Sequence, residues 1–82
     1  MAVQLSLYTR HGCHLCEDME QAVSELAVEL NFKTEIIPID NNSELEQAYG
    51  HRVPVLMMGD NMICEYFLDK QALIQAVSKA NN

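Results

Sequence analysis

Two cysteines three positions apart, Cys13 and Cys16, are the residues of this sequence best suited to chemistry. They stand in the segment HGCHLC, in which His11 precedes the pair and His14 lies inside it. A C-x-x-C segment can cycle between a dithiol and a disulfide, can supply part of a metal site, or can consist of two ordinary buried thiols. The elements that hold the pair decide among these alternatives.

Composition and charge narrow the class of protein. The chain has 82 residues, of which 49% are hydrophobic, and this is the size of one small domain covering residues 1–82. The net charge is -7, from 12 acidic and 5 basic side chains. Nucleic-acid binding and docking on an anionic membrane both need basic patches, so we expect neither partner.

No segment approaches the roughly 18 consecutive apolar residues that a membrane-spanning helix needs. The first ten residues have no charged region and no long apolar run, which argues against a signal peptide. We therefore expect a cytoplasmic protein. In a reducing compartment a C-x-x-C pair indicates catalysis or metal binding rather than a structural disulfide.

The first half of the chain predicts a strand, a helix and a second strand. Residues 3–9 alternate in polarity, as a strand does. From about residue 13 to residue 30, apolar residues recur at three- and four-residue steps, which predicts an amphipathic helix that ends at Asn31. The β-branched run over residues 32–40 predicts the second strand. Such a unit forms a parallel crossover, and the cysteine pair falls where its strand meets its helix.

A short helix follows, through Glu44 to Tyr49. Asn42 or Ser43 is expected to cap it, and Glu46 stands at the capping-box spacing from Ser43. Gly50 is suited to its end.

The last third predicts a β-hairpin and a helix. Strands are expected over residues 53–58 and 62–67, joined by a tight turn, with Met62, Cys64 and Tyr66 on one face of the second strand. Asp69 can cap the final helix. The full order is therefore βαβαββα.

A redox C-x-x-C beside a βαβ pattern is the thioredoxin-like signature. On the segments LYTRHGCHLCEDM and VPVLMMGD, the sequence resembles the thioredoxin superfamily, specifically the small glutaredoxin-like proteins, from Leu5 to Val77. The resemblance implies an α/β, thioredoxin-like fold with a four-stranded mixed sheet in order 2-1-3-4 and helices on both faces. It also implies that Pro54 is cis and faces the cysteines.

The predicted helix start gives the two cysteines different roles. Free N–H groups and the positive end of the helix dipole lower the pKa of a thiol at that position, so we expect Cys13 to be the nucleophile. Cys16, one turn further on, is expected to be more buried and to resolve the mixed disulfide. Glu17 and Asp18 oppose the lowering of the Cys13 pKa, and nearby basic side chains offset part of their effect.

Five residues are expected to bind the substrate: Arg10, His14, Val53, Pro54 and Asp69. Arg10 matches the basic residue that meets a glutathione carboxylate in glutaredoxins, and Asp69 matches an acid of their glutathione-binding segment. Glu65 and Tyr66 replace the glycines of that segment. Because proline cannot donate, the backbone N–H and C=O of Val53 are expected to be free for a substrate peptide.

We therefore expect a monomeric thiol–disulfide oxidoreductase that reduces protein disulfides or glutathione mixed disulfides through Cys13 and Cys16. It would have no bound cofactor and no metal, with glutathione as an alternative co-substrate. Three alternatives stay open: a glutathione-dependent glutaredoxin, a carrier of an iron–sulfur cluster held between two chains, and an adaptor without redox activity. Cys64 is expected to be a buried core residue, with a redox-regulatory role as the alternative.

Overall fold

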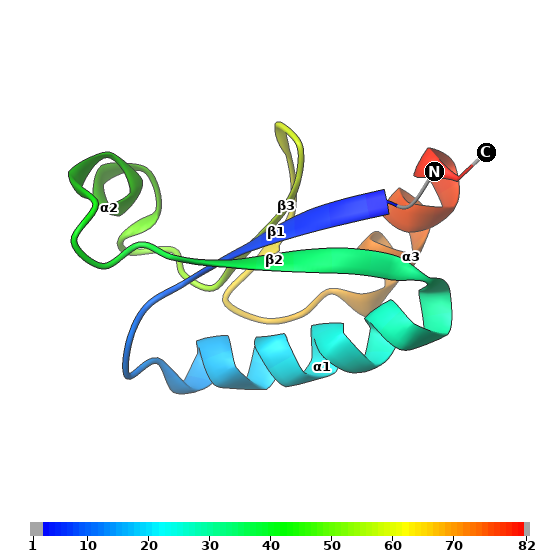
Figure 1. The fold of residues 1–82 in the computed structure, drawn as a ribbon, viewed down its shortest axis with the longest axis horizontal. Helices are drawn as coiled ribbons and strands as arrows, with labels where there is room; N and C mark the ends of the chain where they lie inside the picture. The colour runs from blue at the N-terminus through cyan, green and yellow to red at the C-terminus, as the bar shows by residue number, and fades with distance from the viewer. Residues whose placement is uncertain (1–2, 82) are drawn as a thin grey trace.

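The computed structural model describes residues 3–81 and has the predicted order βαβαββα. Its strands form one sheet in the order β2-β1-β3-β4, in which β1 and β2 are parallel and the other two pairings are antiparallel. None of the helices in this part of the chain has the length and apolar composition that a membrane span requires. The elements, drawn in Figure 1, are β1 (Val3–Thr9), α1 (His14–Leu30), β2 (Phe32–Pro38), α2 (Ser43–Tyr49), β3 (Val55–Met58), β4 (Asn61–Glu65) and α3 (Lys70–Ala80).

The hydrophobic core lies between one face of the sheet and the helices α1 and α3. Alternation along β1 points every second side chain into this core, and its burial drives the packing of both helices. α1 runs beneath the sheet in Figure 1. The core side chains are Val3, Leu5, Leu7, Met19, Val23, Leu26, Phe32, Leu56, Cys64, Leu73 and Val77.

The opposite face of the sheet receives α2. Tyr8 points to this face because it alternates with the buried Leu7, and Tyr49 of α2 stacks on it with ring centroids 4.3 Å apart. Burial, followed by the neighbouring Tyr49, raises the pKa of Tyr8. Helices therefore cover both faces, which confirms the predicted α/β architecture and sheet order.

The N-terminal end of α2 corrects one prediction. Its N-cap is Asn42, whose Oδ1 accepts a hydrogen bond from the N–H of Leu45 at 3.1 Å. Ser43 is therefore the first helical residue, and the capping box between Ser43 and Glu46 was a wrong interpretation. The side chain of Asn42, one residue earlier, already accepts a hydrogen bond from a free N–H group of the first turn.

The hairpin is shorter than predicted and contains an irregularity. β3 begins at Val55, and β4 ends at Glu65. A register shift between Leu56 and Met57 pairs Leu56 with Cys64 but Met57 with Met62. Cys64 thus enters the core while Met62 stays 45% exposed, so the prediction that Met62, Cys64 and Tyr66 share one face is wrong.

Candidate active site

The candidate site stands at the edge of the sheet where β1 ends. Tyr8 pairs with Val55, and Val55 pairs with Glu65. The next residues outward are therefore Thr9, Pro54 and Tyr66, and the N–H of Tyr66 donates to the carbonyl of Pro54 at 2.9 Å. Sheet register thus brings the segment before Cys13, the start of β3 and the end of β4 to one edge.

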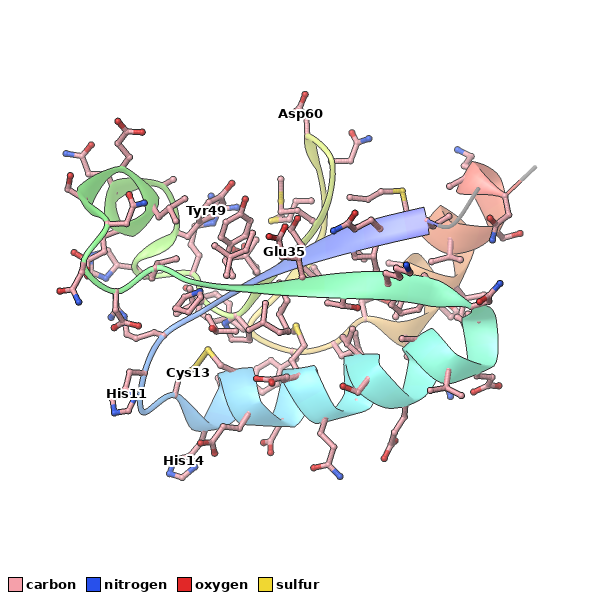
Figure 2. The ribbon with its side chains drawn as sticks, viewed as in Figure 1. His11, Cys13, His14, Glu35, Tyr49 and Asp60 are labelled. Carbon is pink, nitrogen blue, oxygen red and sulfur yellow. A yellow bond between two sulfur atoms is a disulfide. The ribbon has the colours of Figure 1, made fainter. Side chains whose placement is uncertain are left out.

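Cys13 and Cys16 form a disulfide at the start of α1, drawn as a yellow bond in Figure 2. Cys13 is the N-cap of α1, and its Sγ accepts a hydrogen bond from the N–H of Cys16 at 3.0 Å. The same N–H is placed to stabilise a Cys13 thiolate after reduction. Cys13 is half-buried, whereas Cys16 is only 2% exposed. The two sulfurs therefore differ in access as the sequence predicts.

The loop between β1 and α1 is held by Ile39 and Asp40, the two residues that follow β2. The N–H of His11 donates to Oδ2 of Asp40 at 3.0 Å, and the N–H of Ile39 donates to the carbonyl of Thr9 at 2.9 Å. Gly12 has a φ of 74°, a left-handed conformation that glycine adopts without steric cost. This turn lets the chain reverse from the strand into the helix that Cys13 begins.

The Val53–Pro54 peptide bond is cis, and Pro54 is buried. The N–H of Val53 donates to the carbonyl of Tyr49 at 3.1 Å, so the prediction that both backbone groups of Val53 are free is wrong for the N–H. The last turn of α2 supplies the acceptor, which sequence patterns did not reveal. Within residues 3–81, the Val53 carbonyl accepts no backbone hydrogen bond.

Three further predicted substrate-binding residues lie around this edge. His14 is 97% exposed, points from α1 away from the sheet in Figure 2, and lies 3.6 Å from Glu17. The guanidinium of Arg10 reaches the end of α2, where a Cβ on Gly50 would lie 3.3 Å from Nη2. Asp69 caps α3, since its Oδ1 accepts from the N–H of Ala72 at 3.0 Å. Substrate binding by these residues stays a prediction.

No group of three or more His, Cys, Asp or Glu side chains within residues 3–81 is arranged to hold a metal ion. His11 is exposed, and His14 lies on the outer surface of α1. Neither imidazole is hydrogen-bonded to the cysteine sulfurs in the described part of the chain. The hydrogen bond that Cys13 Sγ accepts therefore comes from the backbone of the helix start and not from a histidine.

Sequence reasoning missed the role of the segment after β4. Tyr66 has a φ of 65°, and its hydroxyl donates to the carbonyl of His51. Beside it, Nε of Arg52 donates to Oε2 of Glu65 at 2.7 Å. These bonds fix the loop before Pro54 to the end of β4. The only sequence signal was an aromatic residue at a position where the resemblance implies glycine.

Comparison with known proteins identifies the family of this chain. The family described as "Glutaredoxin-like domain (DUF836)" matches residues 4–78. The chain belongs to this glutaredoxin-like family. The resemblance to glutaredoxin-like proteins is thereby confirmed over almost the whole sequence.

This glutaredoxin-like protein is similar to proteins of known sequence or structure. Protein Ne2328 from Nitrosomonas europaea, a solution structure, is 38% identical, with a TM-score of 0.81 over 93% of this chain and 92% of that chain. The uncharacterised protein Mb0520 of Mycobacterium bovis is 27% identical over 94% of this chain and 84% of its own length. Thioredoxin 1 from Thermosipho africanus, at 14% identity and a TM-score of 0.64, shares the fold alone. The fold and the cysteine pair together support a redox-type role.

Proposed function

We propose that this glutaredoxin-like protein is a thiol–disulfide oxidoreductase that reduces protein disulfides or glutathione mixed disulfides through Cys13 and Cys16. The arrangement of the pair carries the proposal. Cys13 caps α1, accepts the N–H of Cys16 and is partly exposed, whereas Cys16 is buried. An accessible sulfur with a hydrogen-bond donor is suited to attack, and a buried sulfur beside it is suited to resolve.

In the reduced protein, the Cys13 thiolate attacks one sulfur of the substrate disulfide and expels the other as a thiolate. Cys16 then loses its proton and attacks Cys13, which releases the second substrate thiol and forms the Cys13–Cys16 disulfide. Two electrons pass from the protein dithiol to the substrate. A cytoplasmic thiol pool, such as glutathione, would return the pair to the dithiol.

The test is the mass of the protein after equilibration in graded glutathione redox buffers, with free thiols alkylated. We expect a reversible loss of about two daltons confined to Cys13 and Cys16, with a midpoint in the cytosolic range. Cys64 is only 8% exposed and serves as an internal reference that stays reduced. The Cys13→Ser variant is the control, because it removes the couple.

Two other results would redirect the proposal. A stable glutathione adduct on Cys13 would favour a glutathione-dependent glutaredoxin. If the pair neither oxidises nor accepts glutathione, the oxidoreductase proposal fails. Visible absorbance and a dimer after anaerobic purification would then point to a carrier of an iron–sulfur cluster.

A further inference from the structure

A groove runs beside the cysteine pair, between α1 and the segment that joins β4 to α3. Its volume is about 260 Å³. On the α1 side, the lining residues recur every three or four positions and so lie on one face of the helix. The facing wall comes from three consecutive residues after β4. The lining residues are Leu15, Asp18, Met19, Ala22, Tyr66, Phe67 and Leu68. Leu15, which lines the groove, stands between Cys13 and Cys16 in the sequence, so the groove begins at the turn of α1 that carries the disulfide.

The wall after β4 exposes two aromatic side chains on a hydrogen-bonded backbone. Phe67 is 72% exposed and Tyr66 is 40% exposed. The N–H of Phe67 donates to the carbonyl of Glu65 at 2.7 Å, and both the N–H and the hydroxyl of Tyr66 are hydrogen-bonded to the loop before β3. Exposed aromatic groups on an ordered segment are typical of surfaces that bind other proteins.

The helix that forms the other wall is acidic. α1 carries five acidic side chains and neither lysine nor arginine. One of the five, Asp18, lines the groove itself, and the side chain of its sequence neighbour Glu17 is 71% exposed. A negative surface of this kind attracts a segment that contains lysine or arginine and repels an acidic one.

We propose that this groove binds the polypeptide of a protein substrate next to its reacting cysteine. An aromatic or large aliphatic side chain of the substrate enters between Leu15 and Phe67, and a neighbouring lysine or arginine lies against Asp18. This inference rests on the proposed function, and it names the substrate class as basic, apolar protein segments that contain a disulfide. Apolar contact supplies affinity, and charge supplies the preference among segments.

Four cysteine peptides, each carried as a mixed disulfide with thionitrobenzoate, test the proposal. They combine Phe or Ser beside the cysteine with Lys or Glu two residues away. The Cys13 thiolate attacks the peptide sulfur and expels thionitrobenzoate, whose absorbance gives the rate, and Cys16 then releases the peptide thiol. Each rate is divided by the rate of dithiothreitol with the same peptide, which removes the intrinsic reactivity of the disulfide.

We expect the Phe–Lys peptide to react about tenfold faster than the Ser–Glu peptide. Phe67→Ser should lower the rates of the Phe peptides about fivefold and leave the Ser peptides within twofold. Val28→Ser is the matched control, because Val28 is an 86% exposed apolar residue on α1 outside the groove. Asp18→Asn should reduce the preference for Lys over Glu, whereas Glu29→Gln, at the far end of the helix, should not.

Several results would overturn this inference. Equal normalised rates for the four peptides, or a uniform loss in Phe67→Ser, would remove the groove from substrate recognition while leaving the oxidoreductase proposal intact. If the glutathione–thionitrobenzoate disulfide reacts at a higher normalised rate than every peptide, the site belongs to a small thiol. A dimer that Phe67→Ser dissociates would assign the groove to a second copy of the chain. Absence of thionitrobenzoate release from every probe would refute the proposed function itself.

Discussion

The hydroxyl of Tyr66 donates a hydrogen bond to the backbone carbonyl of His51, and this bond joins the end of β4 to the loop that leads into Pro54. The backbone N–H of Tyr66 donates to the carbonyl of Pro54 as well. Tyr66 keeps these contacts in a left-handed conformation, which costs a residue with a side chain about 1–2 kcal/mol. The tyrosine therefore positions one wall of the site at a conformational cost.

Tyr66→Phe removes the hydroxyl and keeps the ring. We expect the free energy of unfolding to fall by about 0.5–1 kcal/mol, the usual net contribution of one hydrogen bond near the surface. Urea unfolding of the oxidised protein measures this change in the free energy of unfolding. Phe67→Leu is the control: Phe67 is the adjacent exposed ring, so this change should stay within about 0.5 kcal/mol. Equal stability of Tyr66→Phe and the unmodified protein would contradict the assigned role.

Gly12→Ala should affect both stability and reactivity. Gly12 has a φ of 74°, and no atom lies within 4 Å of an added Cβ, so the cost of about 1–2 kcal/mol is conformational. Gly59 has a φ of 58° and equally open surroundings, so Gly59→Ala should cost about as much. Only Gly12→Ala should slow thionitrobenzoate release, about tenfold or more, because Cys13 follows it directly. Equal rates in the two variants would show that the turn does not position Cys13.

Serine variants should separate the roles of the two cysteines. Cys13→Ser should reduce thionitrobenzoate release to the level of buffer, because the buried Cys16 cannot reach the substrate. Cys16→Ser should release one thionitrobenzoate and hold the peptide as a stable mixed disulfide on Cys13. Intact mass and peptide mapping distinguish the two variants. A peptide trapped on Cys16 in the Cys13→Ser protein would reverse the assignment.

Cys64 should make the protein less stable at alkaline pH. Burial raises the pKa of the Cys64 thiol above its ordinary value of 9.0. Between the unfolded and the folded pKa the folded state holds more protons, so the free energy of unfolding falls as the pH rises above about 9. The slope for one proton is bounded by about 1.4 kcal/mol per pH unit.

The measurement is urea unfolding at about pH 8, 9 and 10 in the Cys13→Ser/Cys16→Ser protein, in which no other thiol titrates. Adding Cys64→Ala should flatten the fall between the upper two conditions, although it also changes the overall stability. Tyr8, whose pKa burial also raises, titrates in both proteins and cancels from the comparison. If the free energy of unfolding falls equally with pH in both proteins, Cys64 does not contribute to the loss of stability at alkaline pH.

Local patterns were sufficient to predict most of the fold. The polarity of β1, the amphipathic stretch of α1 from about residue 13 to its end at Asn31, and the cap at Asp69 act over a few residues, and each lies where its pattern indicates. The sheet order was predicted by the resemblance alone, and the observed order β2-β1-β3-β4 agrees with it. The accessible and the buried cysteine were predictable for the same reason, since a helix start fixes both positions.

The features that were missed depend on contacts between distant segments. Tyr49 supplies the acceptor that occupies the Val53 N–H, and its ring packs on Tyr8, 41 positions earlier in the sequence, in a stack that no periodicity reveals. The register shift beside Met57 moves Met62 to the other face of the sheet, and a polarity pattern does not show such a shift. Tertiary contacts also hold Tyr66 in a conformation that its side chain disfavours.

The direction of the first strand and the last helix has a practical consequence. β1 runs toward the cysteine pair over seven residues, and α3 begins beside the groove and runs away from it over eleven. Each spans on the order of 20 Å, so β1 begins and α3 ends at the side of the molecule opposite Cys13 (Figures 1 and 2). A bead, a sensor surface or a fused domain linked at either end would leave the disulfide facing outward, ready to be used as an oriented reagent.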